Sequence, residues 1–185
     1  MRSHVQSNRH RTGRLIRSIV VFGMLGALMF LSDVFMDFLP NIHFVGLLSV
    51  LYTVVYRAKA LIPIYVYIAI LGVTSGYATW WIPYLYTWAV LWGMAMLVPK
   101  NAPPLVAKIA YPVMCSLHGF LFGLIYAPGQ ALLFGYDLDM TIVWIMKGIS
   151  FDIIHGISNF AAGLLVYPLS RLLIKLEKKS AYPII

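Results

Sequence analysis

Long apolar segments, separated by short polar or irregular connections, constrain the fold of this chain more than any other feature. Six of them run from about residue 15 to 39, 43 to 56, 60 to 78, 82 to 98, 105 to 126 and 141 to 173. About 20 apolar helical residues cross a bilayer, so only the second segment is short and needs tilt or its flanks to span. A soluble domain of 185 residues could not bury a composition that is 61% hydrophobic and 11% charged. The sequence therefore predicts an all-α integral membrane protein with six transmembrane helices.

The basic residues predict the orientation of these helices. All Lys and Arg residues except Lys147 fall on one side of a six-span arrangement, together with both termini. Cytoplasmic loops carry an excess of Lys and Arg, so we expect cytoplasmic termini in a multi-pass plasma-membrane protein. The expected parts are a basic tail (1–14), a membrane domain (15–176) and a C-terminal tail (177–185). This distribution also accounts for the net charge of +8 without a nucleic-acid partner.

The acidic residues gather on the opposite, outer side. Only Glu177 accompanies the basic residues, and the outer half carries five acids: Asp33, Asp37, Asp137, Asp139 and Asp152. A pocket that opens into such a field disfavours a strongly anionic ligand and suits a neutral or cationic one.

A polar stretch within the last apolar segment is the first candidate site. Asp152, His155 and Asn159 are spaced i, i+3 and i+7, so they share one face of a helix. Ionisable side chains at membrane depth cost several kcal/mol unless they face a protein interior or a wet cavity. This face forms either one wall of a polar pocket or a contact between helices, in which Asp152 and His155 bond to each other or to nearby backbone.

Aromatic residues gather where the third segment ends and the fourth begins. The cluster contains Trp80, Trp81, Tyr84, Tyr86 and Trp88. It is typical of an aromatic belt at a membrane interface, and it equally suits the flat surfaces that stack on a ring-bearing ligand.

Small residues mark a possible helix-docking surface on the first segment. Gly23 and Ala27 lie four residues apart, a spacing that allows close approach of another helix, from a partner or from this chain.

Several kinds of chemistry have no motif here. The chain has no phosphate-binding Gly-x-x-x-x-Gly-Lys-Ser/Thr loop and no His-Glu-x-x-His, and its single cysteine, Cys115, excludes a disulfide. His155-x-x-x-Asn159 resembles half of the motif of CAAX-type intramembrane proteases, but their paired Glu is missing. We expect no metal and no cofactor, and an intramembrane enzyme using Asp152, His155 and Asn159 stays as the alternative from another class.

The chain resembles the substrate-binding S components of energy-coupling factor (ECF) vitamin transporters. The resemblance covers nearly the whole chain, with six spans and cytoplasmic termini. Gly23-Met-Leu-Gly-Ala27 lies where the family carries Ala-x-x-x-Ala, with Gly in place of the first Ala. Leu39-Pro-Asn-Ile-His43 is similar to the first outer loop, and residues 151–160 are similar to the polar face of the sixth helix.

This resemblance implies a high-affinity binding subunit of an importer, itself not an enzyme. It implies docking through the first helix onto a shared transmembrane T subunit, with two ATPase subunits supplying the energy. The implied substrate-binding residues are Trp80, Trp81, Tyr84, Tyr86, Trp88, Lys147, Asp152, His155 and Asn159, with Asn41 and His43 in a capping loop. The favoured vitamin is cobalamin, and thiamine, a pyrimidine and a precursor of queuosine are the alternatives.

Overall fold

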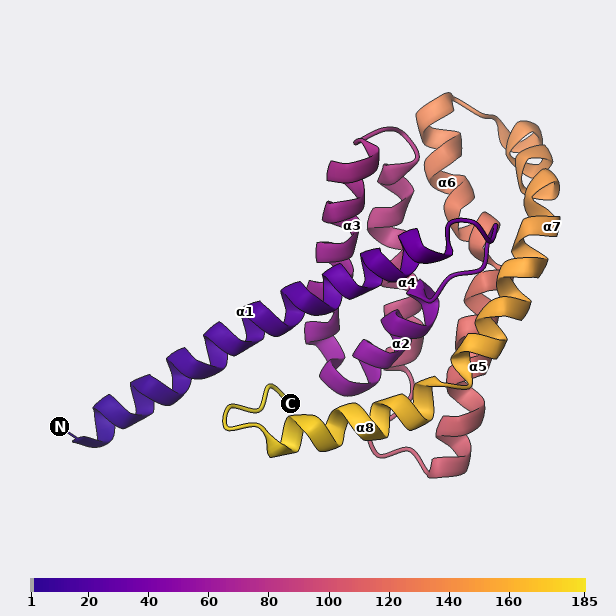
Figure 1. The fold of residues 1–185 in the computed structure, drawn as a ribbon. Coiled ribbons are helices and arrows are strands. Elements are labelled where there is room, and N and C mark those ends of the chain that lie inside the picture. Colours follow the sequence, from indigo (N-terminus) through magenta and orange to yellow (C-terminus); the bar gives the residue numbers. More distant parts are fainter. Residues whose placement is uncertain (1) are drawn as a thin grey trace.

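The protein folds as an assembly of helices (Figure 1). A computed structural model describes residues 2–185, with side chains from residue 11 onward, and within this range 82% of the chain is helical and no strand is present. The prediction of an all-α protein is confirmed. The helices are α1 (Arg2–Met36), α2 (Val45–Tyr56), the 3-10 helix η1 (Arg57–Ala60), α3 (Leu61–Ser75), α4 (Trp81–Met96), α5 (Pro104–Phe120), α6 (Phe122–Phe134), α7 (Leu138–Gly163) and α8 (Val166–Lys179).

Four helical stretches in the described part of the chain are long and apolar enough to cross a membrane. They are Arg11–Met36, Val45–Ser75, Pro104–Phe134 and Leu138–Gly163. The second contains a reversal, because α2 and α3 are joined by η1, where Arg57 adopts φ 55°. These stretches support the prediction of a membrane protein with transmembrane helices.

Contacts along α1 give the direction of its neighbours. Tyr52 donates a hydrogen bond to the Leu25 carbonyl at 3.3 Å, and Tyr56 meets Phe22 edge-on at 5.2 Å between ring centroids. Later residues of α2 therefore contact earlier residues of α1, so the two helices are antiparallel.

Helix α3 runs in the same direction as α1. Gly26 lies against α3 so closely that an added Cβ would be 2.5 Å from Val66 Cγ1, which requires glycine at this position. Farther along both helices, Tyr67 donates to the Asp33 carboxylate at 2.9 Å. The contact between α1 and α3 therefore depends on a small residue that differs from the predicted docking pair.

Helices α5 and α6 continue one another and pack antiparallel to α7. A Cβ added at Gly119 would lie 2.8 Å from the Gly156 Cα, so the two backbones nearly touch. Toward the other end, Tyr126 of α6 stacks on Trp144 of α7 with 5.9 Å between centroids. This hairpin carries His118 and His155 into the interior.

The last predicted segment, residues 141 to 173, is two helices rather than one. Helix α7 ends at Gly163 and α8 begins at Val166, and Figure 1 shows α8 crossing the ends of the other helices. The chain changes direction here because the apolar and charged residues of α8 lie on different faces of the helix. Such an amphipathic helix is stable along a surface rather than across a membrane. The C-terminal tail also folds back, because Ile184 is buried.

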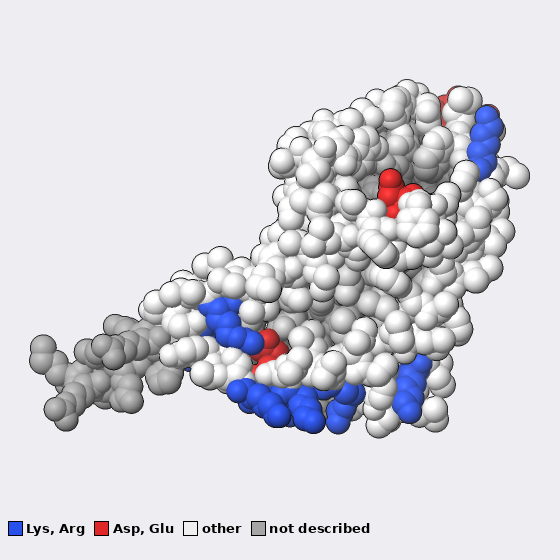
Figure 2. All heavy atoms as spheres, in the orientation of Figure 1, with Lys and Arg blue, Asp and Glu red and all other residues white. Residues whose placement is uncertain are grey.

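The bundle has two chemically different ends. The acidic end contains the connections at residues 37–44, 76–80 and 135–137, and the basic end contains residues 57–60, 97–103 and α8. Figure 2 shows Lys and Arg gathered along the basic end, while carboxylates occupy a hollow and the rim at the other.

Candidate functional site

A cavity of about 200 Å³ opens at the acidic end of the bundle. The end of α1 and the connection to α2 form most of its wall, and α4, α6 and α7 complete it. The lining residues are Asp33, Met36, Asp37, Leu39, Pro40, Asn41, Ile42, His43, Tyr84, Phe122 and His155. The predicted capping loop, 39–43, is therefore part of the cavity, with Asn41 held at φ 60°.

Two histidines face each other at this cavity. The rings of His43 and His155 lie edge-on with 4.7 Å between centroids, and His155 is only 3% exposed. Nδ1 of His43 and Nε2 of His155 are buried and have no hydrogen-bond partner. Burial, and then the neighbouring His118, lowers the pKa of His43 to about 4. A neutral His43 offers one donor and one acceptor to whatever occupies the cavity.

The polar interior continues behind these rings. Trp88 lies 5.8 Å from His43 and 5.5 Å from His118, measured between ring centroids. His118 Nε2 is bonded to the Thr87 carbonyl at 3.0 Å, which leaves its Nδ1 without a partner. Trp88 Nε1 is likewise buried and unpartnered.

Asn159 completes the polar interior one turn beyond His155. It is fully buried, and both its Oδ1 and its Nδ2 lack a partner. The site approaches α2 closely, because a Cβ added at Gly46 would lie 3.0 Å from Asn159 Oδ1. Ser49, one turn along α2, contributes another buried oxygen without a partner.

These residues form a single group, which we call the polar cluster: His43, Ser49, Trp88, His118, His155 and Asn159. Every buried, unpartnered side-chain nitrogen or oxygen among residues 11–185 belongs to it. Buried polar groups are normally paired, and each unpaired one costs about 1–3 kcal/mol. His43 and His155 bring this cluster to the wall of the cavity, as expected of a site whose partners come from a ligand.

Asp152 has a different role from its helical neighbours. Both of its carboxylate oxygens accept from the Gly123 N–H at 3.1 Å, and no bond joins it to His155. Gly123 lies in the first turn of α6, where N–H groups lack helical partners, so the carboxylate caps that helix. The three residues of this face therefore have different roles: Asp152 joins α7 to α6, His155 lines the cavity, and Asn159 is buried one turn beyond His155.

The predicted aromatic cluster is also divided. Tyr84 lines the cavity and Trp88 lies in the polar cluster. Trp81 donates to the Ile68 carbonyl at 2.8 Å, and Tyr86 donates to the Tyr126 carbonyl at 3.1 Å, so both join helices. Trp80 packs edge-on against Tyr84 without lining the cavity.

Lys147 joins Trp80, Trp81, Tyr86 and Asp152 as a predicted binding residue outside the cavity, and other lining residues were missed. Lys147 is exposed on α7 and does not line the cavity. Asp33, Asp37 and Phe122 line it but were not predicted as binding residues. The two acids had a sequence signal, since they are charged residues near the end of an apolar helix, whereas Phe122 had none.

Among the described residues, no group of three or more His, Cys, Asp and Glu side chains converges as a metal site would require. What the geometry offers is hydrogen bonding from neutral rings and an amide, beside the aromatic faces of Tyr84 and Phe122.

Comparison with known proteins adds no relative: no protein-family model, no curated protein and no solved structure matches this chain.

Proposed function

We propose that this chain is a membrane-embedded binding protein for a small, ring-bearing nutrient that is neutral or cationic. The observation that carries the proposal is the polar cluster: its buried atoms lack partners, and two of its residues, His43 and His155, line the cavity. A ligand that forms hydrogen bonds with these atoms offsets the free-energy cost of burying them unpaired, and this free energy contributes to binding affinity.

The lining supports that ligand class. Asp33 and Asp37 border the cavity and no Lys or Arg does, so a negative field disfavours an anion. Tyr84 and Phe122 provide aromatic faces, and the histidines provide donors and acceptors. A planar ring with polar edges fits both.

The cavity also bears on the choice among vitamins. Ligand pockets usually measure about 300–1,000 Å³, and this one measures about 200 Å³. Such a volume favours thiamine, a pyrimidine or a deazaguanine precursor over cobalamin. A corrin macrocycle would enter only if the wall formed by residues 39–43 moved outward.

We further propose that the bundle crosses the membrane six times, with both termini in the cytoplasm. Two features support this topology. Helices α1, α2 and α3 alternate in direction, and the basic residues gather at the end of the bundle where α8 lies. A reporter inserted near Asp137 should be exported, whereas one fused after Ile185 should stay inside. Export of both, or of neither, would contradict this topology.

The proposed assembly is an ECF-type importer, in which α1 docks on the T subunit and partner ATPases supply energy. Gly23 supports this, since an added Cβ would meet no atom within 4 Å, and Ala27 lies one turn away on the same helix. Exposed apolar side chains, including Met24 and Leu28, flank this pair. A helix could therefore approach here without displacing any part of this chain.

The decisive experiment identifies the small molecule that copurifies with the chain, by mass spectrometry, and then measures its affinity for variants. His155→Gln should weaken binding about tenfold or more, as expected when one buried hydrogen bond is lost. Lys147→Gln, on the same helix but exposed, is the matched control and should bind normally. Equal affinities for His155→Gln and the wild type would refute the proposed site.

A further inference from the structure

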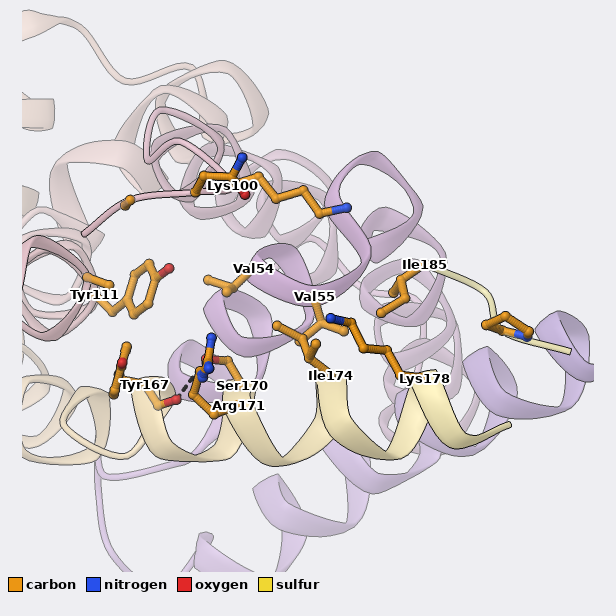
Figure 3. A pocket seen from close by; sticks show the side chains of 14 residues that line it. Val54, Val55, Lys100, Tyr111, Tyr167, Ser170, Arg171, Ile174, Lys178 and Ile185 are labelled. Atoms are coloured by element: carbon orange, nitrogen blue, oxygen red, sulfur yellow. Dashed lines mark hydrogen bonds between the residues drawn. The ribbon is translucent and has the colours of Figure 1, made fainter. Parts of the chain in front are cut away.

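A second cavity, of about 520 Å³, lies at the basic end of the bundle, away from the polar cluster. Helices α2, α5 and α8, the α4–α5 connection and the folded-back tail enclose it, as Figure 3 shows. Three of its lining side chains are cations, and no Asp or Glu lines it: the cations are Lys100, Arg171 and Lys178.

These three cations have no ion-pair or hydrogen-bond partners among the side chains and backbone that the structure describes. Among the side chains from residue 11 onward, the one ion pair joins Arg17 to Glu177. Within that part of the chain, Lys100, Arg171 and Lys178 make neither an ion pair nor a hydrogen bond. Figure 3 shows Lys100 and the α8 cations on opposite sides of the hollow. Cations that converge from two sides without a carboxylate create a field for an anion.

Neutral groups in the same cavity suit an oxyanion. Tyr111 and Tyr167 contribute hydroxyl groups to the lining, whereas Ser170 already donates its hydroxyl to the Tyr167 carbonyl at 2.8 Å. Ala102 also lines the cavity, and it lies just before α5, which starts at Pro104. The N-terminus of a helix is the positive end of its dipole. Hydroxyl and guanidinium donors around one hollow match the several acceptor oxygens of a phosphate group.

The surroundings indicate where such a phosphate comes from. Arg171 also lines two adjoining hollows, and the larger, of about 720 Å³, is bordered by Leu164, Pro168 and Tyr167. The Tyr167 ring lies between the cavity and this hollow and lines both. Lys108 Nζ is 5.4 Å from the centroid of that ring. The cavity with three cations therefore adjoins a more apolar hollow, whose cations Lys108 and Arg171 lie beside Leu164 and Pro168, as a headgroup adjoins its acyl chains.

We propose that this cavity binds the phosphate of an anionic phospholipid headgroup, with Arg171 and Lys178 on one side and Lys100 on the other. The tail wall of this site is held by Lys59, which donates to the Ile184 carbonyl at 2.8 Å. Lipid binding would thereby join the C-terminal tail and α8 to the membrane surface, independently of any ligand at the acidic end.

The test uses the full chain in detergent, titrated with phosphatidic acid and analysed by native mass spectrometry. Each lost cation should weaken binding about fivefold, as for basic residues near an anionic membrane surface. We therefore expect this loss for Arg171→Gln and a larger one when Lys178→Gln is added. Lys100→Gln, from the opposite side, should act similarly and serves if the α8 variants fail to fold. Arg14→Gln, an exposed cation on α1 that lines none of these hollows, is the control.

Two further arms separate the possible outcomes. Phosphatidylcholine, whose headgroup is zwitterionic, should bind far more weakly than phosphatidic acid. Inorganic phosphate should displace the lipid only at much higher concentration; displacement at equal concentration would keep the phosphate site but overturn the lipid as its source. Equal losses for Arg14→Gln and Arg171→Gln would show attraction to surface charge in general and would overturn the site itself.

Discussion

The two ends of the bundle treat buried polar groups in opposite ways. At the basic end, Glu177 is 2% exposed and accepts two hydrogen bonds from Arg17 at 2.8 Å, one from Tyr56 at 3.0 Å and one from the Ile184 N–H at 3.1 Å. In the polar cluster, which reaches the acidic end through His43, six buried residues have atoms without a partner among the described residues. The same chain satisfies a buried carboxylate fully in one place, so the unpaired atoms elsewhere are better explained by function than by poor packing.

This contrast separates structural polar groups from binding groups. Removing a satisfied group leaves its partners unpaired and destabilises the fold. Removing an unsatisfied group relieves a cost in the free protein and should weaken only the complex. Stability and affinity, measured on the same variants, therefore distinguish the two ends.

The largest effect is expected where α5 and α7 touch, because this contact holds His155 in place. Gly119→Val would insert a side chain against the Gly156 backbone and should cost about 3 kcal/mol, together with ligand binding. Gly148→Val, on α7, is the matched control, since no atom lies within 4 Å of its added Cβ. Unfolding in detergent measures both, and equal stability of the two variants would contradict the packing.

Glu177 should have the next largest effect. Glu177→Gln disrupts the charged hydrogen bonds to Arg17 and should cost about 2 kcal/mol in free energy of unfolding, without changing affinity at the acidic end. Asp139→Asn, an exposed acid on α7, is the control and should change stability little.

The same carboxylate predicts a dependence on pH. Burial acts to raise the pKa of Glu177, but hydrogen bonds from Arg17, the Ile184 N–H and Tyr56 outweigh it and hold the pKa below its ordinary value. Its stabilising contribution is therefore complete above the unfolded pKa of about 4.3 and is lost as the pH falls through the lower folded pKa. The stability difference between wild type and Glu177→Gln should shrink across that acidic range, and a constant difference would refute the assignment.

The smallest effect on the isolated chain is expected at Gly23. Gly23→Leu should change stability by no more than about 0.5 kcal/mol, as for an open surface site, and leave ligand binding intact. Gly26→Leu, three residues along, should destabilise the chain, since its Cβ would meet Val66. If α1 docks on a partner, Gly23→Leu should still impair transport; normal transport would return Gly23 to a lipid-facing role.

Much of the fold could be predicted from the sequence because hydrophobicity dominates it. The apolar segments and the separation of charges needed no tertiary information. The break at residues 164–165 was missed because the apolar run continues while the helix changes from one long enough to span a membrane to one with separate apolar and charged faces. Such a change depends on what the segment packs against, here the ends of α2 and α5.

The candidate site was predictable only in part. Periodicity placed His155 and Asn159 on one face of a helix, and both lie in the polar cluster. It also placed Asp152 there, but Asp152 accepts a hydrogen bond from a backbone N–H in the first turn of α6. The sequence pattern does not show that α5 ends and α6 begins at this point. His118 enters the cluster from α5, a contact between distant segments that spacing along the chain cannot reveal.

Asn159→Leu separates a binding from a structural role of the polar cluster, because leucine has the same branched skeleton of four side-chain heavy atoms as asparagine and needs no hydrogen bonds. We predict that the ligand-free variant is as stable as the wild type or more stable by up to about 1 kcal/mol, while it binds the copurified ligand at least about tenfold more weakly. Both quantities come from unfolding of one preparation with and without ligand. A loss of about 2 kcal/mol in the ligand-free protein with unchanged affinity would contradict the account and make Asn159 a structural residue.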